Sequence, residues 1–237
     1  MATPRPLRPV RILITGFASF GGSRVNPSWE AVRRLRRARI AGVRVSVARL
    51  PVVWGETERR LVAAIRRIRP DAVICTGQSS GRAWVSVETR AVNRREGRDD
   101  SERLPRTATV WERASARDRW NRKPPNSLPS TLPVRLILAA LRRAGIPARR
   151  SRDAGRYLCN AAMYTACWVA EGTRPGSGCR GRKAAPTMPS GFIHVPMLPG
   201  QAKGRLRREP TLPLRTILRA VRIAVRTTAW EIRGKRG

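Results

Sequence analysis

Histidine is almost missing from this 237-residue chain, which contains a single one, His194. A metal site built on two imidazoles is therefore excluded. No run of about 20 apolar residues occurs, so the sequence predicts no transmembrane helix. The first residues, MATPRPLRPVRILITGF, show no apolar secretory segment before the first predicted strand. We therefore expect a cytoplasmic protein with no membrane contact.

Cysteine is also scarce, with four residues in the chain: Cys75, Cys159, Cys167 and Cys179. No two of them form a C-x-x-C motif, so neither a zinc ribbon nor a thioredoxin-like pair is supported. In a reducing cytoplasm the thiols stay free, and one of them could then be reactive.

Acidic residues are few. The chain has 15 Asp and Glu against 50 Lys and Arg, which gives a formal net charge of +35. Such a charge attracts nucleic acids and other polyanions without any specific site. The arginines are spread from Arg5 to Arg236, and two tyrosines and three phenylalanines make a poor base-stacking platform. Incidental polyanion binding is expected, and a charge-driven nucleic-acid-binding protein remains an alternative function.

Hydrophobic residues make up 41% of the chain, enough to bury a core. Apolar runs at 10–15, 43–50 and 71–77 predict strands. Helical spacing predicts helices over 26–37 and 56–69 between them. This alternation of strands and helices favours an α/β fold with a parallel sheet.

The remaining chain continues the same pattern with longer interruptions. We predict one domain over 10–232 with flexible termini at 1–9 and 233–237. The further predicted elements are strands at 85–93, 147–151 and 192–196, helices at 132–145, 160–170 and 214–230, and irregular loops at 94–130 and 172–189.

Two glycine motifs suggest other chemistries. The segment from Gly16 to Ser23 nearly fits a phosphate-binding loop, but Gly22 stands where the lysine is required. The segment from Gly77 to Gly81 matches the G-x-S-x-G pattern of a nucleophile elbow, although no helical pattern follows its serine. A serine hydrolase that uses Ser79 with His194 and Asp153 therefore stays open.

Three other residues suggest a cysteine nucleophile. Cys159 opens a helical stretch, where oriented amides favour a thiolate. His194 closes a short strand, a position that often faces the site in α/β folds. Glu88 lies in an apolar strand, where a carboxylate requires a partner. A thiolate, an imidazole and an orienting carboxylate are the components of covalent acyl transfer.

Long blocks of the chain resemble the pyroglutamyl peptidase I family, also called pyrrolidone-carboxylate peptidase, in the family's order. The blocks are ILITGFASFGG, VNPSWEAVRRL, LPVVWG, PDAVICTGQSSGR, ETRAVN, LPVRLILAALRRAGIPA, AGRYLCN and GFIHVPMLP. The resemblance implies a single three-layer α/β/α domain with a twisted, mostly parallel sheet. It also implies a cysteine exopeptidase that releases N-terminal pyroglutamate from peptides without a metal. The family is often multimeric, but the charge of +35 on this chain disfavours a homo-oligomer unless charges are neutralised at its interfaces.

Carried over by motif, the family's catalytic residues fall on Glu88, Cys159 and His194. The resemblance further implies that the substrate contacts Phe17, Phe20, Asn26, the backbone at Gln78, Tyr157 and Leu158. Pyroglutamate is a neutral lactam, so an apolar slot with one donor and one acceptor suits it. Backbone N–H groups near Cys159 and Gln78, assisted by Arg98, would hold the oxyanion.

The chain departs from the family pattern at several positions near the expected site. Val87 replaces the proline before the glutamate, and residues 98–104 read RDDSERL instead of a sequence like R-I-P-D-N-x-G. Ala161 replaces the histidine of the C-N-H motif, and Gly200 replaces the glutamate of an E-Q pair.

Overall fold

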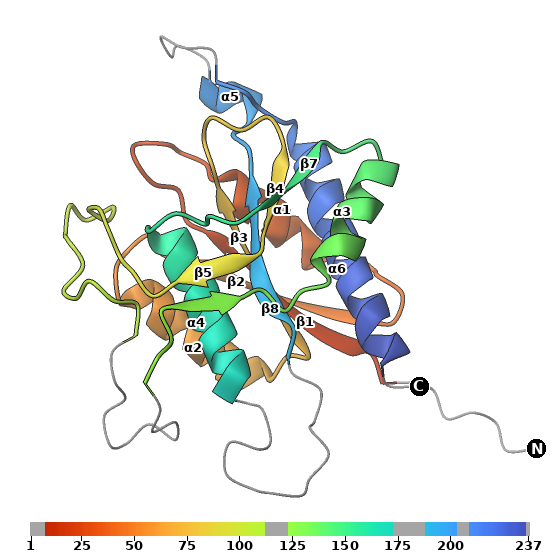
Figure 1. Ribbon diagram of the computed structural model, residues 1–237. Coiled ribbons are helices and arrows are strands. Elements are labelled where there is room, and N and C mark those ends of the chain that lie inside the picture. The colour runs from red at the N-terminus through yellow and green to blue at the C-terminus, as the bar shows by residue number, and fades with distance from the viewer. Residues whose placement is uncertain (1–7, 112–122, 173–187, 203–208, 236–237) are drawn as a thin grey trace, which may run out of the picture.

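A six-stranded sheet forms the centre of the computed structural model, which describes residues 8–111, 123–172, 188–202 and 209–235 (Figure 1). The strand order is β2-β1-β3-β8-β4-β7. The first four strands in this order are mutually parallel, whereas β4 and β7 run the opposite way. The strands are β1 Val10–Phe17, β2 Val43–Leu50, β3 Ala72–Gln78, β4 Val85–Glu88, β7 Ala148–Ser151 and β8 Ser190–Val195.

Helices cover both faces of the sheet, which gives the three layers visible in Figure 1. One face packs against α1 (Pro27–Leu35), α3 (Val134–Arg143) and α6 (Leu214–Gly234). The other face packs against α2 (Glu56–Ile68) and α4 (Leu158–Gly172). The predicted α/β class with a mostly parallel sheet is confirmed.

The local sequence explains where these helices lie. The Asn26 side chain accepts a hydrogen bond from the Ser28 N–H, and Pro27 follows at the first helical position, so α1 begins there. Helix α4 differs from the amphipathic helices because almost every residue from Leu158 to Ala170 is buried. A helix that is apolar all round belongs inside the molecule, and α4 lies against both β3 and β8.

The predicted strand over 85–93 is two strands in different sheets. β4 ends at Glu88, and β5 (Arg90–Val92) pairs with β6 (Ser127–Pro129), a strand within the segment predicted to be irregular. The break falls at Thr89, whose N–H and hydroxyl both donate to the Ser151 carbonyl. The sequence VSVETRAVN reads as one alternating strand across Thr89, so the sequence pattern could not reveal the change of sheet.

Other differences from the predicted elements are small. Helix α4 begins at Leu158, two residues before the predicted start, and the short helix α5 (Pro199–Ala202) was not predicted. The predicted loop at 172–189 lies almost entirely outside the described residues, as do the first seven residues and Cys179. Within the described part of the chain, no helix is long and apolar enough to cross a membrane.

Candidate active site

Glu88 and His194 lie side by side on neighbouring strands. β4 and β8 are antiparallel, with Ser86 opposite His194. The His194 Nδ1 atom is 2.9 Å from Glu88 Oε1, and both side chains are buried. A carboxylate at this position orients the imidazole and leaves its Nε2 atom for other chemistry.

Cys159 reaches the same place from the first turn of α4. Gly77 is paired with His194 across β3 and β8. A Cβ atom added to Gly77 would lie 2.7 Å from the Cys159 sulfur and 2.7 Å from Cζ of Phe192. The Phe192 and His194 rings are themselves in contact, with centroids 4.7 Å apart. The thiol and the His194 backbone are therefore both neighbours of Gly77, and glycine is required there to leave room for the sulfur.

The thiol is free and protonated in this arrangement. Burial, followed by the charge of Glu88, raises the pKa of Cys159 to about 12, and Arg82 lowers it only in part. Desolvation therefore opposes the thiolate that the start of a helix favours. Among the contacts of the described residues, no hydrogen bond joins Cys159 to His194.

The predicted substrate loop follows β1 and folds back onto α1. Phe17 is buried, and Phe20 is partly buried against the same core cluster as Tyr157. The Asn26 amide donates to the Ala18 carbonyl at 2.9 Å, and its oxygen accepts from Ser28. Asn26 therefore shapes the loop through contacts within the chain.

The other predicted substrate residues divide into two groups. Leu158 is buried, and Tyr157 packs edge-on against Trp54 with ring centroids 5.4 Å apart. Burial, with nearby acids and Cys159 adding to it, raises the pKa of Tyr157 to about 12. In contrast, Arg98 is exposed and donates to the Glu102 carbonyl at 2.7 Å. The structure does not bring Arg98 to the Glu88–His194 pair.

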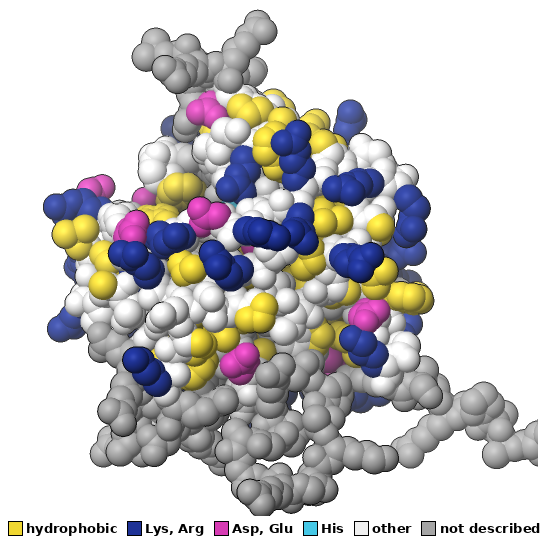
Figure 2. Space-filling view, viewed as in Figure 1, with side chains coloured by type: hydrophobic (Ala, Val, Ile, Leu, Met, Phe, Trp, Pro, Cys, Tyr) yellow, Lys and Arg dark blue, Asp and Glu magenta, His cyan; other side chains and the backbone are white. Residues whose placement is uncertain are grey.

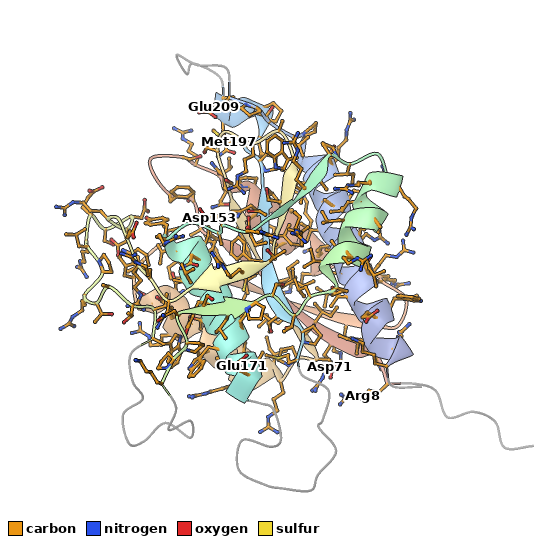
Figure 3. The ribbon with its side chains drawn as sticks, in the orientation of Figure 1. Arg8, Asp71, Asp153, Glu171, Met197 and Glu209 are labelled. Carbon is orange, nitrogen blue, oxygen red and sulfur yellow. The ribbon has the colours of Figure 1, made fainter. Side chains whose placement is uncertain are left out.

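The serine-hydrolase arrangement is not formed. Ser79 follows β3 without a helix behind it, and its N–H donates to the Val195 carbonyl at 2.9 Å. Asp153 is exposed and pairs with Arg156 at 2.9 Å, and Figure 3 shows it near the start of α4. His194 Nδ1 contacts Glu88 instead.

The glycine loop after β1 does not fit a phosphate-binding loop, because an acidic side chain binds to it. In the glycine loop, the Gly21 N–H donates to the Asp100 carboxylate at 2.8 Å. An anionic side chain thus occupies a backbone donor that a phosphate would need.

Comparison with known proteins decides the family. The pyroglutamyl peptidase family model matches residues 10–231. This chain belongs to the pyroglutamyl peptidase family. It is 38% identical to the pyrrolidone-carboxylate peptidase of Bacillus licheniformis, over 90% of each chain. It is 36% identical to that of Thermococcus onnurineus, over 92% of this chain and 98% of the relative.

Solved structures agree with this assignment to the pyroglutamyl peptidases. Pyroglutamyl peptidase I of Bacillus amyloliquefaciens superposes with a TM-score of 0.78 at 31% identity, covering 93% of this chain and 97% of that one. A mutant pyrrolidone carboxyl peptidase from Pyrococcus furiosus gives a TM-score of 0.81 at 30% identity, covering 94% and 100%. The resemblance drawn from the sequence is confirmed.

The structure of this pyroglutamyl peptidase adds residues that the sequence analysis did not single out. Arg82 lies 3.3 Å from Glu88 Oε1. The Gln201 amide donates to Ser23 Oγ and to Gln78 Oε1, so α5 ties the glycine loop to the end of β3. The block GQSSGR carried the only sequence signal for Arg82, and nothing in its spacing showed that the turn returns to Glu88.

Proposed function

We propose that this protein is a cysteine exopeptidase that hydrolyses the amide bond after an N-terminal pyroglutamate. The observation that carries the proposal is the Glu88–His194 hydrogen bond of 2.9 Å beside the free thiol of Cys159, in a chain that belongs to this family. The substrates are peptides, and no cofactor takes part in the reaction.

In the first step the Cys159 sulfur attacks the pyroglutamyl carbonyl. Since the thiol is protonated in the free enzyme, its proton passes to His194 Nε2 as the sulfur–carbon bond forms. Backbone N–H groups at the start of α4 and at Gln78 are the donors we assign to the oxyanion. Glu88 accepts from Nδ1 and stabilises the imidazolium.

In the second step the carbon–nitrogen bond breaks and the leaving amine takes the proton from His194. The resulting thioester on Cys159 is attacked by water, which gives a proton to the imidazole. The sulfur–carbon bond then breaks, pyroglutamate leaves, and the proton returns to the sulfur. Each proton is thus carried by one imidazole, and no net redox change occurs.

Recognition of the lactam rests on its neutrality. Phe17, Phe20, Tyr157 and Leu158 supply aromatic and aliphatic surface on one side of the sheet. An uncharged five-membered lactam loses little solvation there, whereas the protonated ring nitrogen of an N-terminal proline would need a counter-charge. We therefore expect strong preference for pyroglutamyl over prolyl amides.

The test is a pair of fluorogenic amides, pyroglutamyl and prolyl, that differ in the ring carbonyl. We expect hydrolysis of the pyroglutamyl amide only, blockade by iodoacetamide and no effect of chelators. Cys159→Ala should abolish turnover, whereas Cys75→Ala and Cys167→Ala should retain it in folded protein. Normal rates in Cys159→Ala would overturn the proposal, and inactivation by a serine-directed phosphonate would point to Ser79 instead.

A further inference from the structure

Glu88 has a second partner besides the imidazole. Arg82 Nη1 is 3.3 Å from Glu88 Oε1, the oxygen that also lies 2.9 Å from His194 Nδ1. The same Nη1 donates to Ser86 Oγ at 3.0 Å, and Ser86 is buried opposite His194. The guanidinium, the carboxylate and the imidazole therefore form one connected chain of groups.

The turn that carries Arg82 is fixed from both sides. Its first residue, Ser79, donates its N–H to the Val195 carbonyl at 2.9 Å. Gly81 has a φ of 75°, a left-handed conformation that favours glycine, and its N–H donates to Glu209 at 2.9 Å. Figure 3 shows Glu209 beside α5, at the end of the sheet opposite Asp71. The fold thus aims the Arg82 side chain back along β4.

The charge balance around Glu88 depends on Arg82. The Glu88 side chain is 0% exposed, and a buried carboxylate without a charged partner is costly enough to favour its protonated form. Among the described residues, the ion pairs of Glu88 are with Arg82 and His194. His194 is cationic only when protonated, so the permanent positive charge of this set is the guanidinium.

The charge of Glu88 in turn decides which imidazole nitrogen carries the proton. An ionised carboxylate can only accept a hydrogen bond, so Nδ1 must be the N–H and Nε2 keeps its lone pair. A protonated Glu88 could donate to Nδ1 and would leave the hydrogen on Nε2, where it would block proton transfer from Cys159.

We propose that Arg82 is a positioning residue that keeps Glu88 ionised and thereby fixes His194 in the tautomer with a bare Nε2. The catalytic consequence rests on the proposed function, whereas the tautomer itself does not. The charge of Arg82 also lowers the pKa of the Cys159 thiol, against the burial that raises it. Arg82 therefore favours both the proton donor, Cys159, and the proton acceptor, His194.

The chain offers a direct readout because His194 is its only histidine. In protein labelled with ¹⁵N-histidine, both ring nitrogens give unique signals, and at about pH 9 a neutral imidazole reports its tautomer. We expect Nδ1–H in the wild type and a mixed or predominantly Nε2–H population in Arg82→Met. Arg82→Lys should restore most of the wild-type pattern because it keeps the charge.

Arg150→Met is the matched control, since it removes an exposed arginine from the adjacent strand β7, opposite Val87. We expect it to leave the imidazole signals unchanged.

Arg82→Met should also lower kcat for the pyroglutamyl amide roughly 100-fold or more with little change in KM, since an incorrect tautomer impairs the base. Ser86→Ala removes the hydroxyl that accepts from Arg82. It should shift the tautomer population and kcat in the same direction by a smaller amount, and it replaces Arg82→Met in the test if that variant does not fold.

Wild-type tautomer signals in folded Arg82→Met would overturn the proposal, whatever its turnover. Equal changes in Arg150→Met would overturn it as well, because the effect would then come from surface charge alone. If the tautomer responds to Arg82 but no form of the protein cleaves the pyroglutamyl amide, then the proposed function fails and the positioning role of Arg82 stands.

Discussion

At the scale of single residues, the proposed chemistry depends on a partly buried thiol near a buried imidazole. The sequence analysis predicted Glu88, Cys159 and His194 as one set. In the structure Glu88 contacts His194, and Gly77 lies between His194 on the adjacent strand and the Cys159 sulfur. The sequence did not predict what Gly77 or Arg82 does in the structure, because their roles arise from close approach and from a turn that folds back. Neither effect leaves a periodic or compositional signal. The catalytic roles of the three residues stay predictions.

The protonation of the thiol leads to a prediction about alkylation. Burial and the charge of Glu88 raise the pKa of Cys159 to about 12, so the reactive thiolate should be a small fraction at neutral pH. We expect the rate of inactivation by iodoacetamide to keep rising with pH between about pH 6 and 9. A rate that already reaches its plateau near pH 7 would show a preformed thiolate and contradict this account.

At the scale of secondary-structure elements, the order of strands and helices was predictable and the loops were not. Apolar runs and helical spacing indicated β1, β2, β3 and the helices between them, because burial on a sheet or one helix face imposes a period. Residues 98–104, where the chain departs from the family, are instead held by polar contacts, three of which go to one side chain. Asp99 accepts hydrogen bonds from the N–H groups of Trp54, Ser101 and Arg103.

This loop should depend strongly on Asp99. Removing a buried acceptor of three N–H groups leaves them without that partner, so we expect Asp99→Ala to lower the free energy of unfolding by about 1–3 kcal/mol. Asp100→Ala, which removes an exposed carboxylate bound to Gly21, should cost less than about 1 kcal/mol. Chemical denaturation of the three proteins measures both values, and equal losses would refute the special role of Asp99.

The same residue predicts a pH dependence. Burial opposes the charge of Asp99, but the three N–H groups outweigh it and hold its pKa below the usual range. Since the folded-state pKa is the lower one, the stabilisation is complete above about pH 4 and is lost as the pH falls through the folded value. The stability difference between the wild type and Asp99→Asn should therefore shrink below about pH 4. A difference that stays constant down to about pH 2 would contradict this.

At the scale of the whole molecule, the net charge is +35, and Lys and Arg side chains are scattered over the face shown in Figure 2. One groove, of about 870 Å³, lies between α3 and α6. Five arginines line it: Arg39, Arg143, Arg222, Arg226 and Arg233. Neither Glu88, Cys159 nor His194 lines this groove. Polyanions attracted to the groove would therefore bind away from the proposed site.

We accordingly expect duplex DNA or heparin to bind at low salt without sequence preference. The logarithm of the affinity should fall linearly with the logarithm of salt concentration, as counterion release requires. Fluorescence anisotropy at several salt concentrations measures this slope with two unrelated duplexes. A clear preference for one duplex at about 0.15 M salt would instead support a specific nucleic-acid function.

The most direct measurement is the mass of the enzyme during turnover. Rapid acid quenching of a reaction with a pyroglutamyl ester, followed by peptide mass spectrometry, should find a pyroglutamyl group on the peptide that contains Cys159, and hydroxylamine should remove it. Glu88→Gln should slow the appearance of this thioester without moving it to another residue. An acyl group on Ser79, or turnover with no adduct in the Cys159 peptide at any quench time, would contradict the account.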